Sequence, residues 1–116
     1  MPAPGELKSM TLKELRAARK DMLSGPWRLA IKAQPAEVRR AAALRFLDVE
    51  QAILELENAA LADIRDKLAA NEAALIAGTK ALAKARQNLA KVQAVLEALG
   101  TLLTVAAKIA KFVATG

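Results

Sequence analysis

The sequence predicts an all-α fold, and its composition, a leucine repeat and its charge distribution are the observations that predict it. Alanine occurs 28 times and leucine 18 times, and both are strong helix formers, whereas the strand-favouring aromatic residues number one Trp and two Phe. Leucine also recurs at every seventh position, which returns it to nearly the same face of an α-helix. We call this series the leucine stripe and expect it to be the helix-packing interface of a coiled-coil-like helical bundle. Its members are Leu47, Leu54, Leu61, Leu68, Leu75, Leu82, Leu89, Leu96 and Leu103.

Three regions are predicted along the chain. Residues 1–10 are expected to form a flexible tail, residues 11–34 two short basic helices, and residues 35–116 a long leucine-striped helical hairpin. Thr11 and Glu14 have the spacing of a capping box, which predicts that the first short helix begins there.

The boundaries of the second short helix follow from glycine and proline. The run Ser24, Gly25 and Pro26 predicts the end of one helix and the start of the next, because Gly suits the C′ position and Pro suits a first turn. Pro35 is expected to end the second short helix and to open the long segment that follows.

Nothing in the sequence interrupts a helix between Ala36 and Ala77, and such a helix would be about 60 Å long. Gly78 and Gly100 are each followed by Thr, a pattern that fits a helix end followed by an N-cap. Each Gly also fits a continuing helix, at a cost of about 1 kcal/mol. If the chain turns at Gly78, the two halves of the leucine stripe face each other in an antiparallel αα-hairpin. If it does not, another chain has to supply the opposing helix.

Charge favours the turn at Gly78. Residues 1–45 carry a net charge of +6, residues 46–76 carry −5, and residues 77–116 carry +5. An acidic and a basic segment therefore meet at Gly78, and pairing them within one chain costs less entropy than pairing two chains.

A second apolar row runs beside the first half of the leucine stripe. Together the two rows make an apolar face that is too wide for one neighbouring helix, so we expect the N-terminal helices to cover part of it. The contacts expected from those helices are Leu12, Leu15, Leu23, Trp27 and Ile31. The second row consists of Phe46, Val49, Ile53, Leu56, Ala60 and Ile64.

The C-terminal segment has one narrow polar stripe, and its apolar arc exceeds half the helix circumference. Such an arc favours burial in an oligomer or a core, and the alternative is a membrane surface that places the lysines among lipid headgroups. The candidate membrane or oligomer face comprises Leu102, Val105, Ile109, Phe112, Val113, Lys108 and Lys111.

The residue types present argue against an enzyme. The chain has no Cys and no His, so it lacks disulfides, thiolate sites, the commonest general base and the commonest zinc ligand. The sequence Gly78-Thr79-Lys80 lacks the first Gly and the spacing of a phosphate-binding loop. Glu50 and Glu57 lie seven apart, which is typical of a solvated acidic face. We expect no catalytic residue, no metal and no cofactor.

The basic N-terminal third raises the alternative of nucleic-acid binding through phosphates. No cluster of base-reading residues marks the second short helix, so a solvated face that also contacts the acidic segment is favoured. The ten cations are Lys8, Lys13, Arg16, Arg19, Lys20, Arg28, Lys32, Arg39, Arg40 and Arg45.

These features predict a non-enzymatic helical module for protein–protein interaction or assembly. Its expected partner is a second copy of the chain, in a homo-oligomer, or another helical protein. A membrane-peripheral protein and a nonspecific nucleic-acid binder are the alternatives. The N-terminus does not have the pattern of a secretory signal, and no run of eighteen uncharged apolar residues occurs, so the expected location is cytoplasmic by default.

Overall fold

The computed structural model describes residues 2–111, and every regular element within that range is an α-helix. The all-α prediction is therefore confirmed. The six helices are α1 (Pro4–Met22), α2 (Gly25–Lys32), α3 (Ala36–Asn58), α4 (Leu61–Ala70), α5 (Glu72–Ala85) and α6 (Val92–Ala110).

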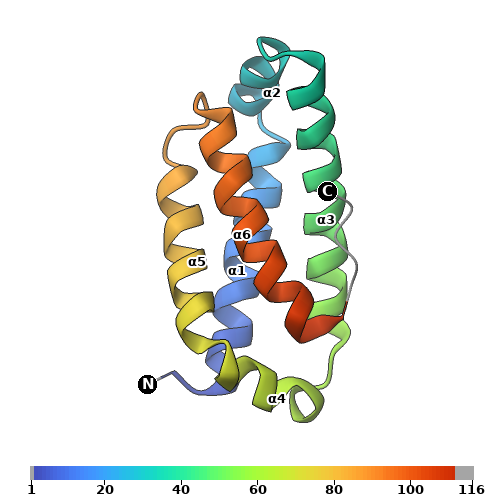
Figure 1. The fold of residues 1–116 in the computed structure, drawn as a ribbon, viewed down its shortest axis with the longest axis vertical. Helices are drawn as coiled ribbons and strands as arrows, with labels where there is room; N and C mark the ends of the chain where they lie inside the picture. The colour runs from blue at the N-terminus through green and yellow to red at the C-terminus, as the bar shows by residue number, and fades with distance from the viewer. Residues whose placement is uncertain (1, 112–116) are drawn as a thin grey trace.

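Four of the helices lie side by side, and α2 and α4 lie at opposite ends of them (Figure 1). Helix α1 packs on α3 and α5, and α6 packs on the same two helices, so the four form a closed ring around one core. The chain ascends in α1, descends in α3, ascends in α5 and descends in α6 (Figure 1). This is the up-down-up-down arrangement of a four-helix bundle.

Each long helix contributes fully buried leucine to the core. Leu15 of α1, Leu56 of α3, Leu82 of α5 and Leu99 of α6 are all 0% exposed. Helix α6 is buried most widely, because α3, α4 and α5 of the same chain all pack on it. Helices of the same chain therefore cover most of the wide apolar arc of α6.

The predicted uninterrupted helix over residues 36–77 is wrong. Helix α3 ends at Asn58, and the molecule measures 44 Å along its longest axis, which is shorter than that helix would be. The chain breaks at Ala59 and Ala60 and again at Asn71. Lys8 of α1 donates a hydrogen bond to the Ala59 carbonyl at 2.8 Å, and the Asn71 side-chain amide donates one to the Lys67 carbonyl at 2.8 Å. Polar side chains thus satisfy carbonyl groups at these breaks, and neither break contains Gly or Pro.

The predicted turn at Gly78 is also wrong, because Gly78 lies inside α5 and is buried. The chain reverses at residues 86–91 instead, so the antiparallel pair is α5 with α6, while α3 and α6 run parallel (Figure 1). A Cβ atom on Gly78 would lie 3.2 Å from Leu102 Cδ1 of α6. The absence of a side chain at Gly78 therefore lets α5 and α6 approach closely. Gly100 likewise lies within α6.

Of the helix boundaries predicted for the N-terminal region, some agree with the structure and others do not. Helix α1 begins at Pro4, seven residues earlier than predicted, and Leu7 is 1% exposed, so residues 4–10 are helical and not a tail. The boundary between α1 and α2 lies at the predicted run of Ser24, Gly25 and Pro26, but Gly25 is the first residue of α2 and not the C′ residue of α1. Ser24 caps α2, and its side-chain oxygen accepts a hydrogen bond from the Trp27 N–H at 3.5 Å. Pro35 immediately precedes α3, as predicted.

Candidate functional site

The structure divides the leucine stripe into buried and exposed members. Leu68, Leu75, Leu82 and Leu103 are buried, and Leu89 and Leu96 are partly buried against the core. The first three members differ, because Leu47, Leu54 and Leu61 are 57%, 51% and 40% exposed.

Helix α3 turns its other apolar row toward the core, so Val49, Ile53 and Leu56 are buried in place of the stripe leucines. Because the helix is interrupted after α3 and again after α4, the later stripe leucines do not share the direction of those on α3. Leu68, Leu75 and Leu82 therefore lie in the core. The coiled-coil-like hairpin is not confirmed, and the exposed leucines leave an apolar surface along α3.

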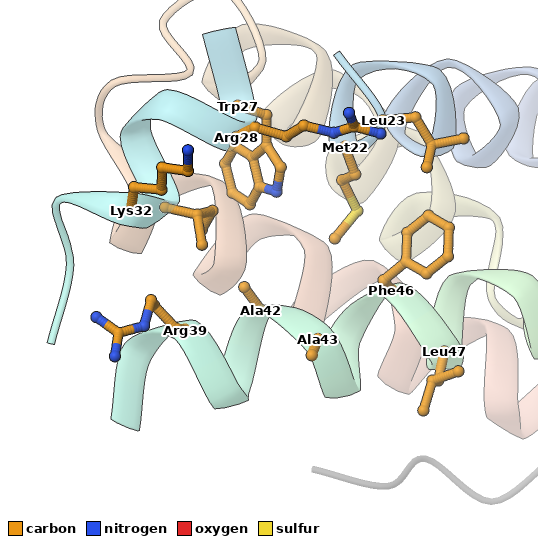
Figure 2. A pocket seen from close by; sticks show the side chains of 11 residues that line it. Met22, Leu23, Trp27, Arg28, Lys32, Arg39, Ala42, Ala43, Phe46 and Leu47 are labelled. Carbon is orange, nitrogen blue, oxygen red and sulfur yellow. The ribbon is translucent and has the colours of Figure 1, made fainter. Parts of the chain in front are cut away.

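An open groove of about 600 Å³ lies between α2 and α3, next to the end of α1. We call it the α2–α3 groove. In Figure 2, Trp27 and Met22 reach toward α3, and Phe46 projects from α3 beside them. Ala42 and Ala43 of α3 also line it, and their small side chains leave room between the helices. The larger apolar lining residues are Met22, Leu23, Trp27, Ile31, Phe46 and Leu47.

The local sequence explains why the groove forms. Ser24 and Pro35 confine α2 to eight residues, so α2 is a short helix across the end of the bundle. Trp27 is 4% exposed and anchors α2 to the core, whereas Leu23 and Leu47 remain 54% and 57% exposed. The groove therefore has a packed floor and exposed apolar edges.

Every polar side chain that lines the α2–α3 groove is a cation. Arg28 and Lys32 come from α2, and Arg39 comes from α3 (Figure 2). Arg39 also donates a hydrogen bond to the Gln34 backbone carbonyl at 2.7 Å. Among the described residues, none of these three cations is within ion-pair distance of a carboxylate. The rim of the groove is consequently positive.

A second hollow, of about 550 Å³, adjoins the first, because Leu47 lines both. Leu54 lines it as well, together with Glu50 and Glu57. These carboxylates form ion pairs with α1: Glu50 with Arg19 and Glu57 with Arg16. The predicted contact between the basic N-terminal region and the acidic segment is thus present, whereas the pairing of these two carboxylates with the C-terminal basic segment is not.

Arg86 forms the most enclosed charge cluster among the pairs between helices. At the end of α5 it binds Glu14 at 2.6 and 3.0 Å and Asp21 at 2.8 Å, both in α1. The hydrogen bond with Glu14 raises the pKa of Arg86 above its usual value, against the opposing effect of burial, and Asp21 adds to the rise. All three side chains are engaged, so this cluster holds α5 to α1.

The candidate C-terminal face is largely internal. Leu102, Val105 and Ile109 are 0%, 8% and 1% exposed, and the exposed members are Lys108 and Lys111. Phe112 and Val113 lie outside the described residues. Helix α6 is long and apolar enough to cross a bilayer, but 44% of that window is buried in the bundle, and the core helix of a bundle meets the same criteria.

The signal for the α2–α3 groove was present in the sequence as a spacing of four residues. Arg28 and Lys32 lie four apart, and Arg39, Ala43 and Leu47 also follow one another at intervals of four, which places each set on one helix face. Trp27 and Ile31 were predicted to cover the apolar face of α3, whereas the cationic rim was not predicted.

No group of three or more carboxylate, His or Cys side chains that could hold a metal ion occurs within residues 2–111. Comparison with protein-family models, with curated proteins and with solved structures found no match.

Proposed function

We propose that this chain is a non-enzymatic interaction module that binds an α-helix of another protein in the α2–α3 groove. The observation that carries the proposal is the exposed apolar lining of the groove, with Leu23 and Leu47 more than half exposed at its edges. Contiguous exposed apolar surface on a folded protein commonly marks a site of protein interaction.

A helix is the ligand that fits the shape and spacing of this surface. The groove lies between two helices, and helices pack by placing the side-chain ridges of one into the groove of another. Leu47 and Leu54 are seven residues apart on α3, so they lie on one face at a separation of about 10.5 Å along the axis. A partner helix with apolar residues at heptad spacing would meet both leucines.

The lining chemistry supports binding and not catalysis. Besides its apolar residues the groove offers guanidinium and ammonium groups, and its lining includes no carboxylate, hydroxyl or amide side chain. The groove therefore lacks the carboxylate, hydroxyl, thiol and imidazole groups that most often serve as general base or nucleophile.

Two observations favour protein over the other partner classes. The apolar residues of α6 that lipid would contact are largely buried by α3, α4 and α5, which counts against a membrane role for that helix. Arg16 and Arg19, two of the cations proposed for phosphate contacts, already pair with Glu57 and Glu50.

Trp27 provides a direct test, because it is the only Trp of the chain and lies in the groove. The probe is an 18-residue helical peptide without Trp, with leucines at heptad spacing and Gln at the flanking positions. Titration should change the Trp27 fluorescence and the NMR signal of its indole N–H in a saturable manner. A peptide of the same composition with scrambled leucines should not.

Ala43→Gln is the matching variant, because Ala43 is exposed in the groove and a longer polar side chain would occupy the space. Ala81→Gln is its control, because Ala81 is an exposed alanine within α5 that does not line the groove. We expect Ala43→Gln to weaken peptide binding at least tenfold and Ala81→Gln to leave it unchanged. Equal binding by both variants, or no saturable signal with wild-type protein, would refute the proposal.

A further inference from the structure

We infer that the partner helix is acidic: it carries carboxylates beside the apolar residues that enter the α2–α3 groove. This inference depends on the proposed function and adds the chemistry of the ligand. Its basis is that three cations line the two sides of the groove and that none of them pairs with a carboxylate among the described residues.

Cations lie on both sides of the groove. Arg28 and Lys32 belong to α2, and Arg39 belongs to α3 on the opposite side (Figure 2). All three residues are exposed, so their charged groups can reach a bound ligand. A helix lying in the groove would therefore have a cation near each of its flanks.

Carboxylates do not balance these cations. Along α1 and the second half of α3, Glu50, Glu57 and Glu14 form ion pairs with arginines. At the groove, none of the three cations has such a partner among the described residues. A ligand that brings carboxylates to this rim gains charge complementarity, whereas a basic ligand meets repulsion.

A second copy of the chain is a poorer partner than an acidic helix, because two copies of a basic chain repel each other. Each chain carries a net charge of +6, and Glu50 and Glu57, beside the exposed leucines of α3, already pair within their own chain. A bilayer is also a poor fit, because the apolar surface is a groove between two helices and a flat lipid surface cannot fill it. The geometry favours a ligand that is convex, apolar and acidic.

The experiment compares three helical peptides that share one leucine pattern and carry Glu, Gln or Lys at the flanking positions. We expect the Glu peptide to bind about tenfold more tightly than the Gln peptide at low ionic strength, because several exposed charge pairs form and each contributes a small part of that factor. The Lys peptide should bind most weakly. The differences should shrink in 0.5 M salt, where the screening length falls well below 10 Å.

Charge reversal at the rim should invert this order. In the double variant Lys32→Glu with Arg39→Glu, the Lys peptide should bind more tightly than the Glu peptide. The control is Lys13→Glu with Lys80→Glu, which changes the net charge equally at exposed residues of α1 and α5 that do not line the groove. That variant should keep the wild-type order.

The outcomes separate the two proposals. Equal binding of all three peptides, or the same inversion in both double variants, would overturn the acidic-partner inference while leaving the groove as a helix-binding site. Failure of every peptide would refute the proposed function itself. Two further results would overturn the inference: vesicles of phosphatidylglycerol and phosphatidylcholine that bind the chain through Trp27 without peptide, or a dimeric molar mass that the Glu peptide does not change.

Discussion

The Arg86 guanidinium at the end of α5 binds the Glu14 carboxylate of α1 through two hydrogen bonds of 2.6 and 3.0 Å. Arg86 donates a third hydrogen bond, of 2.8 Å, to the carboxylate of Asp21, which lies seven residues after Glu14 in α1. The two carboxylates of α1 therefore bind the residue at which α5 ends, just before the chain reverses toward α6. Because the carboxylates raise the pKa of a group that is already always charged, Arg86 stays cationic at every pH at which the protein is handled.

The first prediction follows from the enclosure of this cluster. Arg86 and Glu14 have side chains that are 20% and 11% exposed, so Arg86→Ala would leave two carboxylates without their cation. We expect it to lower the free energy of unfolding by about 2–3 kcal/mol in urea denaturation. Arg16→Ala is the matched control, because the Arg16–Glu57 pair is 45% and 44% exposed and should contribute less than about 1 kcal/mol. Equal losses would show that Arg86 does not anchor α5.

The second prediction concerns two members of the leucine stripe. Leu75 is 0% exposed and Leu54 is 51% exposed, although both occupy the same heptad position. Leu75→Ala should cost about 2–5 kcal/mol of unfolding free energy because it leaves a cavity, whereas Leu54→Ala should cost less than about 1 kcal/mol. If thermal melting shifted equally for the two variants, the burial pattern described for α3 and α5 would be incorrect.

The third prediction uses the two glycines that lie inside helices. Alanine at Gly100 would meet only the Arg45 side chain at 3.6 Å or more, so Gly100→Ala should stabilise the protein by about 0.5–1 kcal/mol through helix propensity. At Gly78 the new methyl group would lie 3.2 Å from the fully buried Leu102, and this crowding should cancel the gain. Chemical denaturation of both variants measures the difference, and equal stabilisation would argue against a close approach of α5 to α6.

The fourth prediction tests the break between α3 and α4. Lys8→Met removes the donor to the Ala59 carbonyl and should cost about 1–2 kcal/mol, with faster hydrogen exchange confined to residues 57–64. Lys13→Met is the control, since Lys13 is exposed on the same helix and should have little effect. Unchanged exchange at the α3–α4 junction would mean that the hydrogen bond from Lys8 does not stabilise the backbone there.

The helical class and several boundaries were predictable because their causes are local. Alanine and leucine content acts locally, as do the run of Ser24, Gly25 and Pro26 and the position of Pro35, and α2 and α3 begin at these two sites. The wide apolar face of α6 was also correctly predicted to need several neighbours, since the amount of apolar surface is visible in the sequence. The wide face predicted for α3 is covered only in part, because Leu47 and Leu54 stay exposed.

The tertiary structure decided where the long helices break and which leucines are buried. The break at Ala59 has no Gly or Pro, and Lys8, 51 residues away in sequence, binds the Ala59 carbonyl. The break at Asn71 does have a local cause, because the Asn71 side chain binds the Lys67 carbonyl four residues earlier. The exposed Leu47 is indistinguishable from the buried Leu75 in a heptad pattern, because periodicity records spacing and not phase relative to the core. Only the packing of four helices in one ring selects that phase, and the leucines it leaves outside form the edge of the α2–α3 groove and the surface beside it.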